Sequence, residues 1–142
     1  MSGDDPDLDV ERRQEAGRWL GVAIADMRVM RMCLEAAQPE AGIAAYLCQQ
    51  AAEKLVKGLL VVAGVRFART HDMARLGDLA AAHYPALRDL LEATGRLTAW
   101  SYAYRYPGVE EVVEPSPTVL RQLLMIVEQI ADRLRALGVS EA

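Results

Sequence analysis

Apolar side chains recur every three or four residues along most of the chain, a spacing typical of α-helices that bury one face. One such stripe lies near the C-terminus, at Leu120, Leu123, Val127, Ile130, Leu134 and Leu137. Another lies near the N-terminus, at Trp19, Ala23, Met27, Met30, Leu34 and Ala37. No stretch of useful length alternates between apolar and polar residues, as a half-buried strand would. The sequence therefore predicts an all-α fold.

Proline, glycine and capping residues divide this pattern into five predicted helices. They cover residues 8–37, 43–63, a short stretch up to His83, residues 85–106, and a last helix from Pro117 through Leu137. Gly64 is placed to end the second helix, Thr70 or Asp72 to start the third, and Ser116 to start the last. Glycine inside a helix is unfavourable, so Gly58 predicts a close approach of a neighbouring helix. Four longer helices and one short one predict an antiparallel up-and-down helical bundle.

The length of 142 residues suits a single domain. We expect an acidic N-terminal arm over residues 1–7 and the helical bundle over residues 8–138. A hydrophobic fraction of 52% and a charged fraction of 25% indicate a globular chain. Cys33 and Cys48 lie in apolar stretches, and their spacing fits neither a zinc site nor a disulfide framework, so we expect two small buried thiols. No targeting signal or membrane-spanning run is evident, which favours the cytoplasm and no membrane partner.

The net charge of −4 hides an uneven distribution. Residues 1–15 carry six acidic side chains against two arginines, whereas residues 54–75, the basic segment, carry five cationic side chains against one acidic side chain. The net charge excludes a surface that is positive all over, but it is compatible with a local group of basic residues that binds phosphate.

Three polar clusters could carry chemistry. The first is Gln49, Glu53 and Lys57, spaced by four on one helical face. The second is Arg66, Arg69, His71 and Asp72, where a cationic loop meets a helix start. The third is the segment 102–107, in which Arg105 stands between tyrosines. Spacing alone favours plainer interpretations: a solvent-exposed face with one Glu–Lys pair, a polar loop, and tyrosine packing at a helix end.

The three clusters, in this order, resemble a known family. The runs 51–60 (AAEKLVKGLL), 70–76 (THDMARL) and 105–107 (RYP) are similar to the HEPN domain, named for higher eukaryotes and prokaryotes nucleotide binding. The resemblance spans most of the chain. It implies a bundle of four longer helices with a short extra one, often a homodimer, and frequent pairing with a minimal nucleotidyltransferase as a toxin–antitoxin couple.

The resemblance also implies site residues. Glu53, Lys54 and Lys57, then His71 and Asp72, then Arg105 and Tyr106 match the family's pattern. The leading hypothesis is a module that binds nucleotide or RNA phosphate, needs no cofactor or metal, and works with a nucleotidyltransferase partner. Its predicted phosphate-binding residues are Lys54, Lys57, Arg66, Arg69, His71, Arg105 and Tyr106.

Two other hypotheses remain open. Many members of the family are metal-independent ribonucleases in which four to six residues separate an Arg from a following His, and Arg66 and His71, with four residues between them, have this spacing. They precede the third helix, however, and no His follows Arg105. In this enzyme the homodimer would bring Arg66 and His71 together as catalytic residues on RNA.

The third hypothesis is a purely structural interaction protein. In it, the seam from Leu120 to Leu137, or the first helix, forms the contact surface. The chain lacks the motifs of P-loop, dinucleotide-binding and zinc-peptidase proteins, and it has only His71 and His83 as imidazoles. Metal and dinucleotide chemistry therefore has no sequence support.

Overall fold

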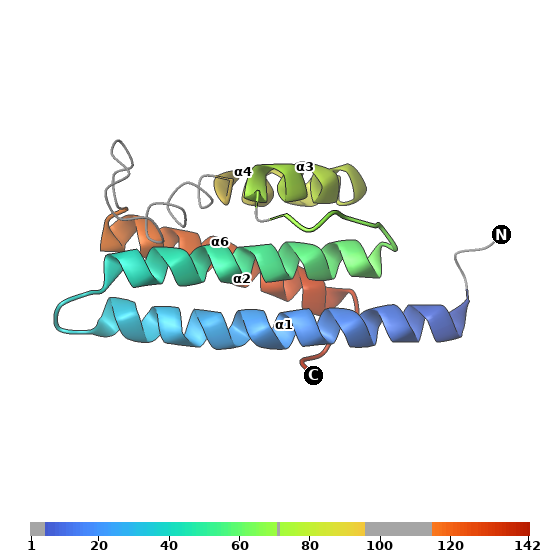
Figure 1. Ribbon diagram of the computed structural model, residues 1–142, viewed down its shortest axis with the longest axis horizontal. Helices are drawn as coiled ribbons and strands as arrows, with labels where there is room; N and C mark the ends of the chain where they lie inside the picture. The colour runs from blue at the N-terminus through green and yellow to red at the C-terminus, as the bar shows by residue number, and fades with distance from the viewer. Residues whose placement is uncertain (1–4, 71, 96–114) are drawn as a thin grey trace.

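The computed structural model describes residues 5–70, 72–95 and 115–142. Three long helices lie lengthwise beside one another, and a layer of shorter helices lies over α2 and α6 (Figure 1). The elements are α1 (Pro6–Glu35), α2 (Ala41–Val62), α3 (Met73–His83), the 3₁₀ turn η1 (Pro85–Leu87), α4 (Arg88–Ala93) and α6 (Pro117–Ala136). The described residues contain helices and no strand, so the predicted all-α bundle is confirmed.

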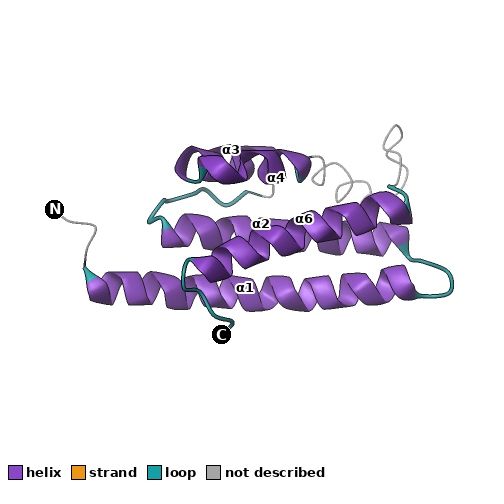
Figure 2. Ribbon diagram, turned by 180° about the vertical axis from the view of Figure 1, so that it is seen from behind, coloured by secondary structure: helices purple, strands orange, loops and turns teal. Residues whose placement is uncertain are grey.

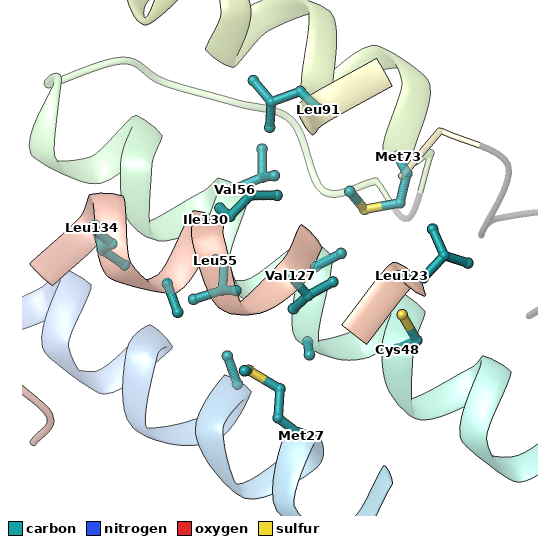
Figure 3. Close-up of a cluster of buried hydrophobic side chains, with 14 of the residues drawn as sticks. Met27, Cys48, Leu55, Val56, Met73, Leu91, Leu123, Val127, Ile130 and Leu134 are labelled. Atoms are coloured by element: carbon teal, nitrogen blue, oxygen red, sulfur yellow. The ribbon is translucent and has the colours of Figure 1, made fainter. Parts of the chain in front are cut away.

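Helix α2 is the centre of the packing. It contacts α1 on one side and α3 and α6 on others, whereas α1 and α3 make no comparable contact. Helices α2 and α6 both run opposite to α1, and α6 crosses the α1–α2 pair obliquely (Figure 2). The core between them is apolar, with Met27, Leu55, Val127 and Ile130 among its buried residues (Figure 3).

The predicted helix ends are close to those observed. Asp5 caps α1 by accepting hydrogen bonds from the backbone N–H groups of Asp7 and Leu8. Helix α2 begins at Ala41, two residues before the predicted start at residue 43, and so includes Gly42 in its first turn. It ends at Val62, and Gly64, two residues later, has a φ of +71°, in the left-handed region that glycine tolerates best.

Gly58 marks a close helix crossing, as its position in the sequence predicts. A Cβ atom added there would lie 2.9 Å from Cδ2 of Leu134 on α6 and 3.6 Å from the backbone oxygen of Ala16 on α1. Glycine at this position lets three helix surfaces meet without a side chain between them.

The layer above α2 begins at Asp72, which caps α3 by accepting from the N–H groups of Ala74 and Arg75. The prediction of one continuous helix from Pro85 to Tyr106 is wrong within the described residues. A 3₁₀ turn comes first, and α4 ends at Ala93. The backbone N–H and the hydroxyl of Thr94 both donate to the backbone oxygen of Leu91. The N–H of Gly95 donates to the backbone oxygen of Glu92. These bonds span three residues rather than four, so the last turn of α4 is tightened and the helix ends there.

Ser116 caps α6, because its hydroxyl accepts from the N–H of Val119, and Pro117 is the first residue of the helix. Its stripe from Leu120 to Leu134 is buried in the core. The hypothesis that this seam forms a dimer surface is therefore wrong, because the seam already packs within the chain. After α6 the tail folds back on α1, where Val139 is buried and the N–H of Ala142 donates to the oxygen of Gly17.

The two cysteines are free and differ in exposure. Cys48 is fully buried, and burial raises the pKa of its thiol to about 12. Cys33 is only half-buried. The prediction of two buried thiols is thus confirmed for Cys48, whereas Cys33 is only partly buried.

Candidate functional site

Glu53 is a charged residue in the middle of the bundle, fully buried on α2. Its Oε1 accepts a hydrogen bond from Nε2 of Gln49 at 3.1 Å. Its Oε2 lies 3.1 Å from Nζ of Lys54 and 3.3 Å from Nζ of Lys57. A buried carboxylate is costly unless it is paired, and these contacts pair it with two cations and an amide.

A chain of amides extends this network along α2. Nε2 of Gln50 donates to Oε1 of Gln49 at 3.0 Å, and Nζ of Lys54 lies 3.4 Å from Oε1 of Gln50. Each contact joins residues on the same or an adjoining face of one helix, as their spacing requires. The side chains are therefore held in defined positions rather than free in solvent.

The face that carries Gln49, Glu53 and Lys57 is buried, which overturns the interpretation from spacing that it is solvent-exposed. The physical reason is that α2 is the central helix, so its polar face also meets neighbouring elements. The Lys57 side chain keeps 10% of its surface exposed and that of Lys54 keeps 19%, so both lysines reach solvent at the edge of the network.

Two aromatic rings lie against the lysines. The Trp19 ring of α1 has its centroid 5.8 Å from Nζ of Lys54 and 5.6 Å from Nζ of Lys57. Phe67, in the loop after α2, has its ring centroid 6.0 Å from Nζ of Lys57. Because both ammonium groups contact the same Glu53 oxygen, they lie on one side of the indole. Such cation–π contacts stabilise the charges where solvation is reduced.

Asp26, on α1, adds a second carboxylate near Lys54. Burial raises the pKa of Asp26 above its ordinary value, while the Lys54 ammonium acts in the opposite direction. The charged groups that these contacts join are Glu53, Asp26, Lys54 and Lys57. Their formal charges sum to zero, so the pairs largely offset one another.

Arg66 and Arg69 are exposed on the loop between α2 and α3. Phe67 lies between them in the sequence and reaches Lys57, so this loop passes beside the lysine pair. In Figure 1 the loop runs back along α2, between α2 and the layer that holds α3 and α4. Four of the predicted phosphate-binding residues therefore belong to one part of the molecule.

The remaining predicted site residues, His71, Arg105 and Tyr106, lie outside the described residues. The pairing of Arg66 with His71 that a ribonuclease would need stays a prediction. The described part of α3 does show that Asp72 serves as a helix cap, with its carboxylate on the N–H groups of Ala74 and Arg75.

Sequence reasoning missed Trp19 and Asp26 as members of the site. Trp19 fits the apolar stripe of the first helix, and Asp26 is an ordinary helical carboxylate in sequence. Neither carries a local signal, because both approach the lysines only when α1 packs on α2.

The family model for the HEPN domain matches residues 16–137. The chain belongs to the HEPN domain family. The match extends from the α1 turn that precedes Trp19 to the end of α6, and so contains the whole Glu53 network. Searches of the curated proteins and of the solved structures gave no significant match.

Membership of the HEPN family supports a nucleotide- or RNA-related module. In the part of the chain that the structure describes, no three His, Cys, Asp or Glu side chains gather as metal ligands would. No helix among the described residues is long and apolar enough to cross a membrane.

Proposed function

We propose that this HEPN chain binds the phosphate of a nucleotide or RNA beside Lys54 and Lys57. The observation that carries the proposal is the lysine pair itself, held side by side by Glu53 and backed by Trp19 and Phe67. An ammonium has three donors, and the described contacts of Lys57 within hydrogen-bond distance use one. The other donors of these lysines serve an incoming phosphate oxygen.

Arg66 and Arg69 supply the additional positive charge. Both are exposed, on a loop that Phe67 anchors next to Lys57. Guanidinium groups bind phosphate through two parallel hydrogen bonds and are weakly hydrated, so they suit this role. Because Glu53 and Asp26 neutralise the two lysines, the arginines give the site its net attraction for an anion.

Titration of the protein with a fluorescent single-stranded RNA and with labelled mononucleotides tests this proposal. We expect saturable binding that weakens with salt, about tenfold or more loss for Lys54→Gln or Arg69→Gln, and a shallower salt dependence in each variant. Arg133→Gln, at an exposed position on α6, is the matched control and leaves binding unchanged. If Lys54→Gln and Arg69→Gln bound as tightly as the control Arg133→Gln, or if no binding saturated, the proposed phosphate site would be wrong.

The same titration separates the alternatives. Cleavage of the RNA probe in the presence of EDTA, lost in His71→Ala, would assign the ribonuclease activity instead. Circular dichroism of each variant confirms that the helical fold is kept, so loss of binding reports on the site.

We further propose that the chain is a homodimer that acts with a minimal nucleotidyltransferase in a toxin–antitoxin couple. Membership of the HEPN family supports both points. Expression of this chain alone is expected to slow growth, and coexpression with a neighbouring nucleotidyltransferase gene is expected to restore it. Unimpaired growth with the chain alone would reject the toxin role.

A further inference from the structure

A shallow hollow lies on α1 beside the lysine pair. Its volume is about 280 Å³, and it is lined by Glu15, Arg18, Trp19 and Val22. These residues project from one side of the helix, because they lie at positions i, i+3, i+4 and i+7. Trp19 gives the hollow an aromatic wall, and Val22, which is 49% exposed, gives it an apolar one. The hollow therefore suits a flat ring the size of a nucleobase.

Trp19 connects this hollow to the proposed phosphate site. Its ring centroid lies 5.8 Å from Nζ of Lys54 and 5.6 Å from Nζ of Lys57, so the same indole borders the ammonium groups and the hollow. In a nucleotide, one ribose separates the phosphate from the base. A nucleotide whose phosphate contacts the lysines therefore has its base within reach of the hollow, where an aromatic side chain is available for stacking.

The two charged walls of the hollow are Glu15 and Arg18, about one turn apart on α1. Both side chains are exposed, and neither has a hydrogen bond or ion pair in the part of the chain that the structure describes. They do not pair with each other, although a separation of three residues favours an ion pair on a helix. The hollow thus has a carboxylate acceptor and a guanidinium donor at its rim, both available to a ligand.

Guanine matches this pair of groups better than the other RNA bases do. Its Watson–Crick edge has two neighbouring donors, the ring N–H and the 2-amino group, and one carboxylate accepts from both. Its O6 and N7 atoms are neighbouring acceptors, which a guanidinium binds through two hydrogen bonds. Adenine and cytosine have a ring-nitrogen lone pair beside the amino group, and uracil has a carbonyl oxygen on each side of its N–H. Each of these three bases would turn a lone pair toward the Glu15 carboxylate.

We propose that this hollow is a base subsite selective for guanine, in which Trp19 stacks on the base, Glu15 accepts from its Watson–Crick edge and Arg18 donates to O6 and N7. The inference rests on the proposed function, because the phosphate of the same nucleotide contacts Lys54 and Lys57. The cations attract any nucleotide, whereas the hollow discriminates between bases. The site therefore prefers a guanosine nucleotide, or a guanosine within a single RNA strand.

Calorimetric titration of the full chain with guanosine monophosphate (GMP) and adenosine monophosphate (AMP) tests the base preference. We expect GMP to bind about tenfold more tightly than AMP, and Glu15→Gln to abolish this preference, because an amide turns a donor toward one of the two guanine donors. Glu11→Gln, at an exposed position on α1 that does not line the hollow, is the matched control and keeps the preference. Equal affinities for GMP and AMP in the wild type, or a preference that Glu15→Gln leaves unchanged, would overturn the guanine assignment.

Tryptophan fluorescence separates the base subsite from the phosphate site. The chain has two tryptophans, so Trp100→Phe leaves Trp19 as the only one. In this variant GMP is expected to quench the Trp19 emission strongly by stacking, whereas ribose 5-phosphate, which lacks a base, binds with little quenching. Trp19 emission that stays unchanged while GMP is bound would reject the base subsite and keep the phosphate site. If neither GMP nor ribose 5-phosphate binds, both proposals are wrong.

Discussion

Nζ of Lys57 lies 3.3 Å from Oε2 of Glu53, one turn away on α2, and the Glu53 side chain is fully buried. This pair joins the core to the candidate site, because the same carboxylate oxygen also holds Lys54. The arrangement brings two ammonium groups close together while Glu53 offsets their repulsion. The stability of the bundle and the geometry of the site therefore depend on one side chain.

Glu53→Gln is expected to lower the free energy of unfolding by about 3 kcal/mol, because it leaves two poorly solvated cations without their shared carboxylate. Urea unfolding followed by circular dichroism measures the change. Adding Lys57→Met to Glu53→Gln is expected to recover part of the loss, since an apolar side chain suits the space between Trp19 and Phe67. If Glu53→Gln alone were as stable as the wild type, the pairing of the Glu53 carboxylate with the two lysines would not stabilise the fold.

Asp26 gives the fold a pH dependence of known sign. Burial raises its pKa, so the folded state holds the proton to higher pH than the unfolded chain does. The contribution of Asp26 to the free energy of unfolding is favourable below the ordinary aspartate pKa of about 3.9. This contribution is lost as the pH rises through the pKa that Asp26 has in the folded state. Asp26→Asn is therefore expected to be more stable than wild type at neutral pH, with the gain disappearing in acid. Unfolding at a series of pH values measures this, and a gain that grows toward low pH would contradict the sign.

Two buried helical glycines are expected to respond oppositely to alanine. At Gly77 an added Cβ would meet only ordinary contacts, 3.5 Å from the oxygen and 3.7 Å from Cβ of Leu91, so Gly77→Ala stabilises by about 0.5–1 kcal/mol. At Gly58 the added Cβ would lie 2.9 Å from Cδ2 of Leu134, which is fully buried. Gly58→Ala is expected to destabilise despite its higher helix propensity. Thermal unfolding of both variants measures the difference, and a stabilising Gly58→Ala would show that α6 can move away.

The sequence predicted the helices well because their signals are local. Asp72 and Ser116 cap helices as their positions indicate, and Gly64 follows the end of α2 with a positive φ. The prediction of one continuous helix was wrong at Thr94 and Gly95, which tighten the last turn of α4. The apolar stripe continued past this point in the sequence, and periodicity alone does not register such a break.

The sequence predicted only some of the residues of the candidate site. Lys54 and Lys57 share a region of α2 by spacing, and the family resemblance that they help to carry is confirmed by the HEPN match. Trp19 and Asp26 reach them from another helix, and no spacing rule connects residues of α1 with residues of α2.

The sequence by itself determined that this chain is an all-α HEPN domain, because helix periodicity, caps and short motifs are properties of neighbouring residues. Only the tertiary structure decided that Glu53 is buried and that the outer face of α1 is exposed. Spacing places residues on one face of a helix, but the helices that pack around it decide whether that face meets water, a core or a further partner.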